Sequence, residues 1–273
     1  MSLSSLAPVL RPGSGQVSDA QVVTRKVWRI SRDLRAGLAA AFMVLVACLT
    51  QPIPASAEAA TRGAIVSLAL WSDGSVFRSE AKGAAQIVSR RYGHGGPVIV
   101  RVNTGKSFAA GPRGMVQALA AAERGMDPAR DVLFLILSSH GAPEGIAEKG
   151  GRVEGLLSPR SLGEVLAQSA FKHKVLIVSA CFAGIFTPLA NDDTLVITAA
   201  DATHPSFGCE EGRTWTYFGD AFFNDALRKA GPLPERFEAA KALIRAREEA
   251  QGFDPSNPQI AGGSNVLPLI DGP

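Results

Sequence analysis

One histidine and one cysteine of this chain follow apolar runs, and together they have the residue types of a thiol-based reaction site. His140 closes the apolar run 132–137 and is followed by Gly141, and Cys181 follows the apolar segment 174–180. A cysteine attacks a carbonyl carbon as thiolate, so it needs a neighbouring base. An imidazole can take that proton and return it near neutral pH. The pair therefore indicates nucleophilic catalysis by a thiol.

The other three histidines stand in segments of a different kind. His94 lies in the turn-rich segment RYGHGGP, which favours a solvated loop, and His173 is flanked by two lysines, which predicts an exposed start of a strand. His204 falls in the loop after a later strand and is kept as a candidate residue at the rim of the site. Only His140 both ends a buried strand and precedes a glycine whose N–H a substrate can approach.

The cysteines also divide by position. Cys48 lies in the N-terminal leader, and removal of that leader leaves Cys181 and Cys209. In an oxidising compartment these two cysteines can form one disulfide, which is the alternative to a free thiol. We expect Cys181 to be the working thiol and Cys209 to be a small core residue.

Several other chemistries lack their sequence signatures. The segment NTGKS (103–107) resembles the end of a phosphate-binding loop, but that loop needs a glycine where this chain has Val100. No Gly-x-Ser-x-Gly elbow follows a strand, and no pair of His or Cys has metal-ligand spacing. Residues 58–273 hold 22 basic and 23 acidic side chains, which gives no argument for nucleic-acid binding. We therefore expect no metal, no organic cofactor and no nucleic-acid partner.

Residues 1–57 have the order of a targeting leader. Six basic and two acidic residues are accompanied by an uncharged run of 14 residues and then by a small-residue site that ends at Ala57. This order predicts an export signal cleaved after Ala57, which leaves a domain of residues 58–273 in the periplasm or outside the cell. Two alternatives stay open. The segment LVAC is also typical of a lipoprotein signal with a lipid on Cys48, and the leader is alternatively an uncleaved, tilted membrane anchor.

The elements that must position His140 and Cys181 follow from the apolar runs. These runs are continuous and rich in β-branched residues, which indicates strands covered on both faces. Helical patterns alternate with them, so we predict an α/β fold, a three-layer α/β/α sandwich around a mainly parallel sheet of about six strands. Ligands of such sheets bind beyond the carboxyl ends of the strands. Both residues follow carboxyl ends, so we expect their side chains at the same edge of the sheet.

The sequence predicts the following elements. Strands are expected at 63–71, 97–103, 131–139, 174–180 and 194–200, with a short sixth strand in the tail 254–270. Helices are expected at about 79–91, 113–123, 161–171, 220–229 and 234–251.

Two motifs carry a resemblance to a known family. LFLILSSHG, which contains His140, and VLIVSACFAG, which contains Cys181, resemble the two strand ends of the legumain-like cysteine peptidases, relatives of caspases. TLVITAADATHPSFGC and TYFGDAFF are similar to the segments that follow the nucleophile strand in that family. The resemblance covers roughly residues 63–229. It implies a caspase-like fold, a peptide or protein substrate and an exported, bacterial-type endopeptidase.

The resemblance also implies roles for single residues. It makes Cys181 the nucleophile and His140 the general acid and base, and it assigns the oxyanion hole to the N–H groups of Gly141 and Cys181. Legumains cleave after Asn and less readily after Asp. The positions that match the arginine, serine and aspartate of their substrate pocket are Arg78, Ser206 and Asp220.

Four positions depart from the pattern of the family. Ser179, also assigned to substrate binding, stands two residues before the nucleophile, where legumains have a glutamate. Ser79, Val76 and Ser139 replace a histidine, an asparagine and an aspartate of the family. One carboxylate fewer makes the pocket more positive, so we expect a smaller preference for Asn over Asp.

Two further functions remain open at this stage. In a transamidase or peptide ligase, an amine intercepts the same thioester in place of water. A catalytically idle relative would instead be a peptide-binding protein of the cell envelope.

Overall fold

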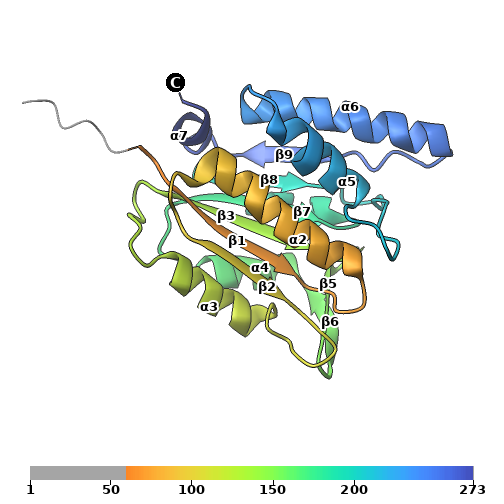
Figure 1. Cartoon of the computed structure of the whole chain (residues 1–273), viewed down its shortest axis with the longest axis horizontal. Helices are drawn as coiled ribbons and strands as arrows, with labels where there is room; N and C mark the ends of the chain where they lie inside the picture. Colours follow the sequence, from red (N-terminus) through yellow and green to blue (C-terminus); the bar gives the residue numbers. More distant parts are fainter. Residues whose placement is uncertain (1–59, 273) are drawn as a thin grey trace, which may run out of the picture. The chain divides into compact units, whose positions relative to one another are not determined.

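A six-stranded sheet forms the centre of the structure, a computed structural model that describes residues 60–272. The strand order is β2-β1-β3-β7-β8-β9; β9 is antiparallel to its neighbour, and the other neighbouring pairs are parallel (Figure 1). The bounds are β1 Gly63–Ala69, β2 Val98–Val102, β3 Val132–Ser138, β7 His173–Ser179, β8 Thr194–Thr198 and β9 Gln259–Gly262.

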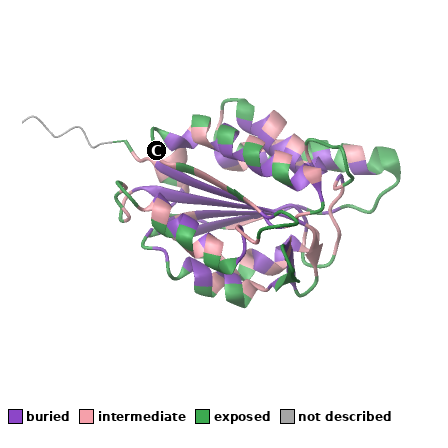
Figure 2. Ribbon diagram, turned by 60° about the horizontal axis from the view of Figure 1, so that its bottom comes forward, coloured by how far each residue is buried: buried purple, intermediate pink, exposed green. Residues whose placement is uncertain are grey.

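Helices cover both faces of this sheet, and Figure 2 shows the buried strands between the two helical layers. One layer holds α2 (Ser75–Val88), η1 (Ser89–Gly93), α5 (Tyr217–Gly219), η3 (Asp220–Asp225), η4 (Ala226–Arg228), α6 (Leu233–Gln251) and α7 (Leu267–Asp271). The other layer holds α3 (Pro112–Ala122), α4 (Pro159–Leu166) and η2 (Ala183–Leu189). The prediction of a three-layer α/β/α sandwich with a mainly parallel sheet is confirmed.

The continuous apolar runs serve both layers. All residues of β1, β3 and β8 are buried. Along β3, Phe134 and Ile136 join the core on the α2 and α6 side, whereas Leu133 and Leu135 join the core on the α3 and α4 side. This alternation follows from the period of two in a strand, and it explains why the strand sequences are apolar at every position.

A second, antiparallel sheet follows directly after β3, and the sequence did not predict it. Its strands are β4 (Gly141–Ala142), β5 (Gly145–Gly150) and β6 (Val153–Leu157), in that order. The N–H of Lys149 in β5 donates to the carbonyl of Leu70 at 2.8 Å, and the N–H of Ser72 donates to the carbonyl of Lys149 at 3.1 Å. The small sheet is therefore attached to the chain that leaves β1, at the carboxyl edge of the main sheet.

Three predicted helices differ from the structure in their limits. The helix expected at 161–171 is α4, which starts at Pro159 and ends at Leu166. The helix expected from residue 79 starts at Ser75, which places Arg78 inside its first turns. The N–H of Ser75 donates to Glu211 at 3.0 Å, a partner distant in sequence that no local pattern reveals. The helix expected at 220–229 is a succession of α, π and 3-10 turns over residues 217–228.

The prediction for His173 is wrong, because this residue is buried. His173 is the first residue of β7, in register with Val132 of β3, and it is 7% exposed although lysines flank it. Its Nδ1 lies 3.4 Å from Asp193. His94 is exposed, as predicted for a loop residue.

The predictions for the leader concern residues outside the described part of the chain. They include the cleavage after Ala57, the lipid on Cys48 and the membrane anchor. Between residues 60 and 272, no helix combines the length and the apolar composition that crossing a membrane requires.

Candidate active site

His140 and Cys181 lie at the same level of two neighbouring parallel strands. In the register of β3 and β7, Ser138 pairs with Ser179, and each of the two residues follows its strand end by two positions. The N–H of Ser139 donates to the carbonyl of Ser179 at 3.2 Å, which extends the pairing by one step. The structure therefore brings both residues to one place on the carboxyl edge.

The backbones of Gly141 and Cys181 come into close contact. A Cβ atom on Gly141 would clash with the carbonyl oxygen of Cys181 and would stand 3.1 Å from its nitrogen. Only glycine allows this approach of the two loops. The two backbone N–H groups that the sequence assigned to an oxyanion hole thus belong to chain segments that touch.

The thiol of Cys181 is half-buried and is held by Ser206. The N–H of Ser206 donates to Sγ at 3.3 Å, Sγ donates to the carbonyl of Ser206 at 3.3 Å, and the Ser206 hydroxyl lies 3.8 Å from Sγ. The next residue, Phe182, has a left-handed backbone with φ of 56° and donates its N–H to the carbonyl of His204 at 3.0 Å. This sharp turn leaves the Cys181 side chain at the edge of the sheet.

The imidazole of His140 packs edge-on against two aromatic rings. The ring centroids lie 4.7 Å from Phe77 and 5.3 Å from Trp71. Burial in this apolar surrounding lowers the pKa of His140 below that of a free imidazole. The ring is therefore neutral at neutral pH and is able to accept a proton.

A buried carboxyl group lies behind these residues. Glu80, on α2, is completely buried; it accepts from the hydroxyl of Ser138 at 2.9 Å, the N–H of Thr216 at 2.9 Å and the hydroxyl of Thr216 at 2.6 Å. The sequence analysis missed Glu80. Its spacing from Ala84 and Ile87 places it on the apolar face of the helix, which is a signal that was available in the sequence.

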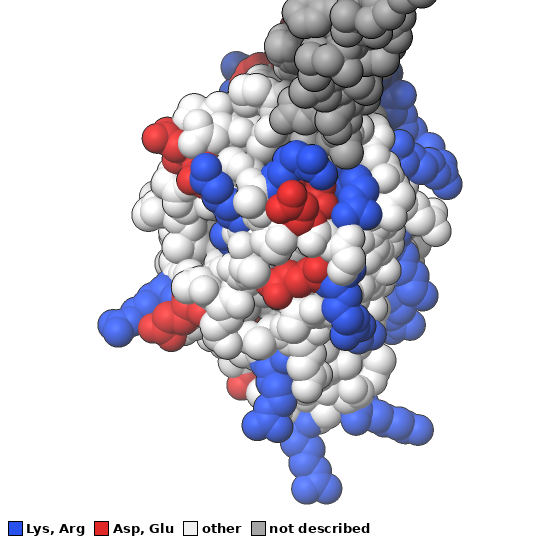
Figure 3. All heavy atoms as spheres, turned by 90° about the vertical axis from the view of Figure 1, so that its left-hand side faces the viewer, with Lys and Arg blue, Asp and Glu red and all other residues white. Residues whose placement is uncertain are grey.

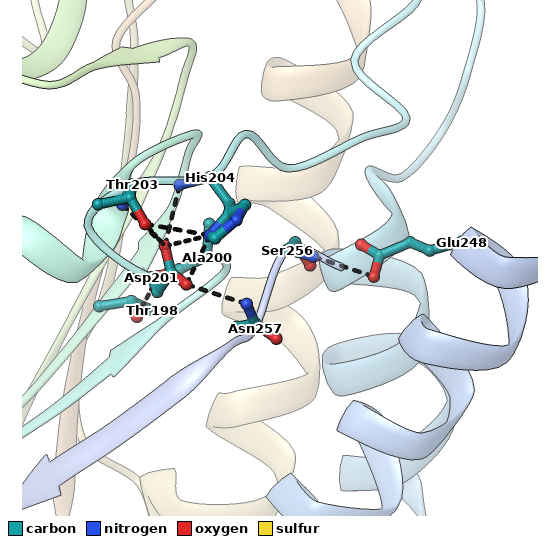
Figure 4. A network of polar contacts seen from close by, with 8 residues as sticks. All are labelled: Thr198, Ala200, Asp201, Thr203, His204, Glu248, Ser256 and Asn257. Carbon is teal, nitrogen blue, oxygen red and sulfur yellow. Dashed lines mark hydrogen bonds and ion pairs between the residues drawn. The ribbon is translucent and has the colours of Figure 1, made fainter. Parts of the chain in front are cut away.

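His204, the candidate rim residue, is bound to Asp201 (Figure 4). Its Nδ1 lies 2.7 and 2.8 Å from the two carboxylate oxygens of Asp201. Burial opposes ionisation of Asp201, but hydrogen bonds from the Thr203 backbone, Asn257 and His204 outweigh it and hold the pKa of Asp201 well below its usual range. Because the carbonyl of His204 accepts from Phe182, this network fixes the loop beside Cys181.

The residues assigned to substrate binding are distributed more widely than the catalytic pair. Ser206 contacts the thiol, and Ser179 is buried with its hydroxyl 3.3 Å from that of Thr216. Arg78 is exposed on α2. Asp220 forms an ion pair with Arg247 of α6 at 2.8 Å. Their roles in substrate binding stay predictions.

Cys209 is a free thiol, as is Cys181, so the structure contains no disulfide between them. Cys209 packs against the apolar cluster formed by Ala69, Val76, Phe77 and Ala81. Burial raises the pKa of the Cys209 thiol, and the neighbouring Cys181 adds to the shift. A raised pKa leaves little thiolate at neutral pH, which disfavours Cys209 as a nucleophile. In the part of the chain from residue 60 to 272, no group of three or more His, Cys, Asp or Glu residues is arranged to hold a metal ion.

Two comparisons with known proteins returned matches. A model of the peptidase C13 family matches residues 94–264, more than half of the chain. The matched range contains the strand ends with His140 and Cys181 and begins after Arg78. A search of curated proteins returned no relative. One matching solved structure is the crystal structure of caspase-1 from Spodoptera frugiperda, with a TM-score of 0.49 and 14% identity over 74% of this chain and 86% of that chain.

Proposed function

Because the chain belongs to the peptidase C13 family, the legumain family, and is therefore a cysteine peptidase, we propose that Cys181 is its nucleophile and His140 its general acid and base. The observation that carries the proposal is the register of β3 and β7, which sets both residues two positions beyond paired serines. The contact between Gly141 and Cys181 gives further support.

The proposed reaction has two proton transfers in each half. Neutral His140 takes the thiol proton while Cys181 Sγ attacks the carbonyl carbon of the peptide bond. The C–N bond then breaks, and the imidazolium gives its proton to the leaving amine. Water, deprotonated by His140, attacks the resulting thioester. The carboxyl product leaves, and the thiol regains its proton.

The N–H groups of Gly141 and Cys181 are proposed to bind the oxyanion formed in each half. They are backbone donors held by folding, so they need no reorganisation during the reaction. Loss of one such donor raises the barrier by about 2.7–4 kcal/mol in comparable enzymes.

We further propose cleavage after Asn or Asp, with Arg78, Ser179, Ser206 and Asp220 forming the pocket for that side chain. The ion pair of Asp220 with Arg247 neutralises the remaining acid of the pocket. An anionic substrate side chain then meets less repulsion, so we expect a smaller preference for Asn over Asp than in legumains. A peptide library in which only the residue before the cut varies tests this. Cleavage mainly after Arg, Lys or large apolar residues would reject the pocket.

Labelling of the thiol tests the catalytic assignment. A peptidyl electrophile that ends in Asn or Asp should modify Cys181, located by mass spectrometry, and should leave Cys209 unmodified. The His140→Ala variant should react much more slowly because its thiol lacks the base. Absence of labelling in the parent protein would favour the idle, peptide-binding alternative.

We also propose that the protein is exported and that the leader is removed after Ala57. The order of basic, apolar and small residues in the leader supports this. The intact mass of protein from an exporting host should correspond to a chain that begins at Glu58. A diacylated Cys48 would establish the lipoprotein route instead, and a full-length, membrane-bound chain would establish an anchor.

A further inference from the structure

We propose that Glu80 is a positioning residue that fixes the relative placement of His140 and Cys181 without touching the substrate. The inference rests on the proposed catalytic pair. Glu80 lies on helix α2, outside the two strand-end motifs that contain His140 and Cys181.

The first argument is the set of chain segments that meet at this carboxyl group. Glu80 accepts from Ser138 at the end of β3 and twice from Thr216, which precedes α5. The hydroxyl of Thr216 uses its proton on Glu80, so at the 3.3 Å contact with Ser179 the Ser179 hydroxyl is the donor. One carboxyl group therefore joins α2 to β3, to the loop before α5 and, through Thr216, to β7.

The second argument is the distance along the chain between these serines and the catalytic pair. Ser138 precedes His140 by two residues, and Ser179 precedes Cys181 by two residues. On the face of β3 that packs against α2, Phe134 and Ile136 are apolar. The last residue on this face is Ser138, which has a hydroxyl group. The β7 strand repeats this change, with Val175 and Ile177 followed by Ser179. In both strands a serine thus stands at the carboxyl end of this face, where Glu80 binds Ser138 directly and reaches Ser179 through Thr216.

The third argument is the closeness of the packing around Glu80. A Cβ atom on Gly219 would clash with Oε2 of Glu80, so glycine is required there. The N–H of Gly219 donates to the hydroxyl of Thr216 at 2.9 Å, which fixes that hydroxyl from the other side. Thr216 and Glu80 are buried, and in the described residues the donors that bind Glu80 are uncharged. A buried network whose members are all hydrogen-bonded holds them in one arrangement.

The expected consequence is a loss of turnover larger than any loss of fold. Displacement of a reacting group by about 1 Å can lower a rate by about 100-fold. If the ends of β3 and β7 shift when the network is broken, the distance between thiol and imidazole changes. Of the four residues proposed for the pocket, Ser179 belongs to the network, whereas Ser206 and Asp220 bind other partners. We therefore expect kcat to fall and KM to change little.

The experiment uses Glu80→Gln and a matched pair at Thr216. Thr216→Val keeps the shape and removes the hydroxyl, whereas Thr216→Ser keeps the hydroxyl. Asp131→Asn is the control: Asp131 is also completely buried and also accepts three hydrogen bonds, but at the opposite edge of the sheet. For each full-length variant we would measure the unfolding midpoint, kcat and KM for a peptide, and the rate at which iodoacetamide alkylates Cys181 as a function of pH.

We expect Glu80→Gln and Thr216→Val to lower kcat by about 10- to 100-fold with KM within about threefold of the parent. Their pH profiles of Cys181 alkylation should differ from that of the parent. Thr216→Ser should have the kcat and the alkylation profile of the parent. Asp131→Asn should also keep both, although its unfolding midpoint falls. Parent-like kcat and parent-like alkylation in Glu80→Gln and Thr216→Val would overturn the inference, as would equal losses in Thr216→Ser.

The two proposals fail in different ways. If Cys181→Ala retains peptidase activity, the catalytic pair is wrong whatever Glu80 does. If Cys181→Ala is inactive and the parent alkylation profile is unchanged by Glu80→Gln and by Thr216→Val, the pair stands and the positioning role of Glu80 is rejected. Should Glu80→Gln fail to fold, the Thr216 pair decides the matter alone.

Discussion

Two completely buried carboxyl groups, one at each end of the strands of the central sheet, are bound by different partners. At the amino edge, before β3, Asp131 accepts from the backbone N–H groups of Arg62 and Asp127 and forms a 3.1 Å ion pair with the Arg62 guanidinium. At the carboxyl edge, Glu80 is bound by two hydroxyl groups and one N–H. Figure 3 views the molecule from the side where the strands begin and shows acidic side chains beside Lys and Arg.

The comparison shows two uses of a buried acid. Burial opposes ionisation of Asp131, but two backbone hydrogen bonds and the Arg62 side chain outweigh it and lower the pKa of Asp131. That arrangement stabilises the folded chain at neutral pH. A fixed cation beside the catalytic pair would stabilise the thiolate independently of His140. The uncharged partners of Glu80 avoid this, so the carboxyl edge gains rigidity without an added positive charge.

The largest effect on kcat/KM is expected for substitutions of the proposed catalytic pair at the carboxyl edge, and none is expected at the amino edge. Cys181→Ala and His140→Ala should each lower kcat/KM by on the order of 10³-fold or more, because each removes an indispensable group from one reacting unit. Their unfolding midpoints should stay within a few degrees of the parent. Asp131→Asn serves as the control and should retain kcat/KM. Near-parental activity in either catalytic variant would contradict the mechanism.

Gly141→Ala should have the next largest effect. The added methyl group would clash with the carbonyl of Cys181 and displace a proposed oxyanion donor, so we expect kcat to fall about 100- to 1,000-fold. Gly155→Ala, in β6 of the same small sheet, is the matched control, since nothing lies within 4 Å of its added Cβ. Equal activity of the two variants, measured with one peptide substrate, would argue against a close contact between the Gly141 and Cys181 segments.

At the amino edge, Asp131→Asn should lower the free energy of unfolding by about 1–3 kcal/mol at neutral pH, the usual cost of an unsatisfied buried group. The folded-state pKa of Asp131 lies below its unfolded value, so its stabilisation is present above the unfolded pKa. It is lost as the pH falls through the folded pKa. Urea unfolding at several pH values should show the gap between parent and variant closing in acid. A gap that widens in acid would show the opposite sign.

A smaller effect concerns the pH dependence of the reaction. Because burial lowers the pKa of His140, the acid limb of kcat/KM should lie below that of a free imidazole. Trp71→Ala exposes the His140 ring to water, which should raise its pKa. The acid limb of kcat/KM should therefore move to higher pH by up to about one unit. Asp131→Asn, far from the ring, should leave the limb in place. A downward movement in Trp71→Ala would show that burial is not the cause of the shift.

The smallest effect is expected for Cys209→Ala. This thiol packs in an apolar cluster and has a raised pKa, so its loss should leave kcat/KM within about threefold of the parent. Inactivation of this variant under reducing conditions would mean that Cys209 takes part in the chemistry. Detection of a disulfide between Cys209 and Cys181 in active protein would exclude Cys181 as a free nucleophile.

Elements with long apolar runs were predictable from the sequence. All six strands of the central sheet were expected, and the mainly parallel arrangement followed from the alternation with helices. The short strands of the second sheet were not expected, because residues 141–157 include five glycines and several charged residues and contain no long apolar run. The central strand β5 is also hydrogen-bonded to Leu70 and Ser72 after β1, which are distant in sequence.

The site divides in a similar way. His140 and Cys181 were identifiable because each interrupts an apolar strand pattern at its end. Glu80 was not identified, because its partners Ser138 and Thr216 lie 58 and 136 residues away along the chain. The burial of His173 was mispredicted for a related reason, since the flanking lysines say nothing about residues such as Asp193 that meet it in space.

The small antiparallel sheet has a consequence for how the imidazole is prepared for reaction. The carbonyl of His140 accepts from the N–H of Ala147 in β5 at 2.9 Å, and the hydroxyl of Ser139 donates to the carbonyl of Ala147 at 2.6 Å. The backbone of His140 is therefore fixed, and its side chain retains only two torsions. Ordering a backbone residue costs about 1–2 kcal/mol in conformational entropy. For this histidine that entropy is lost once, when the chain folds, and not again at each encounter with a substrate.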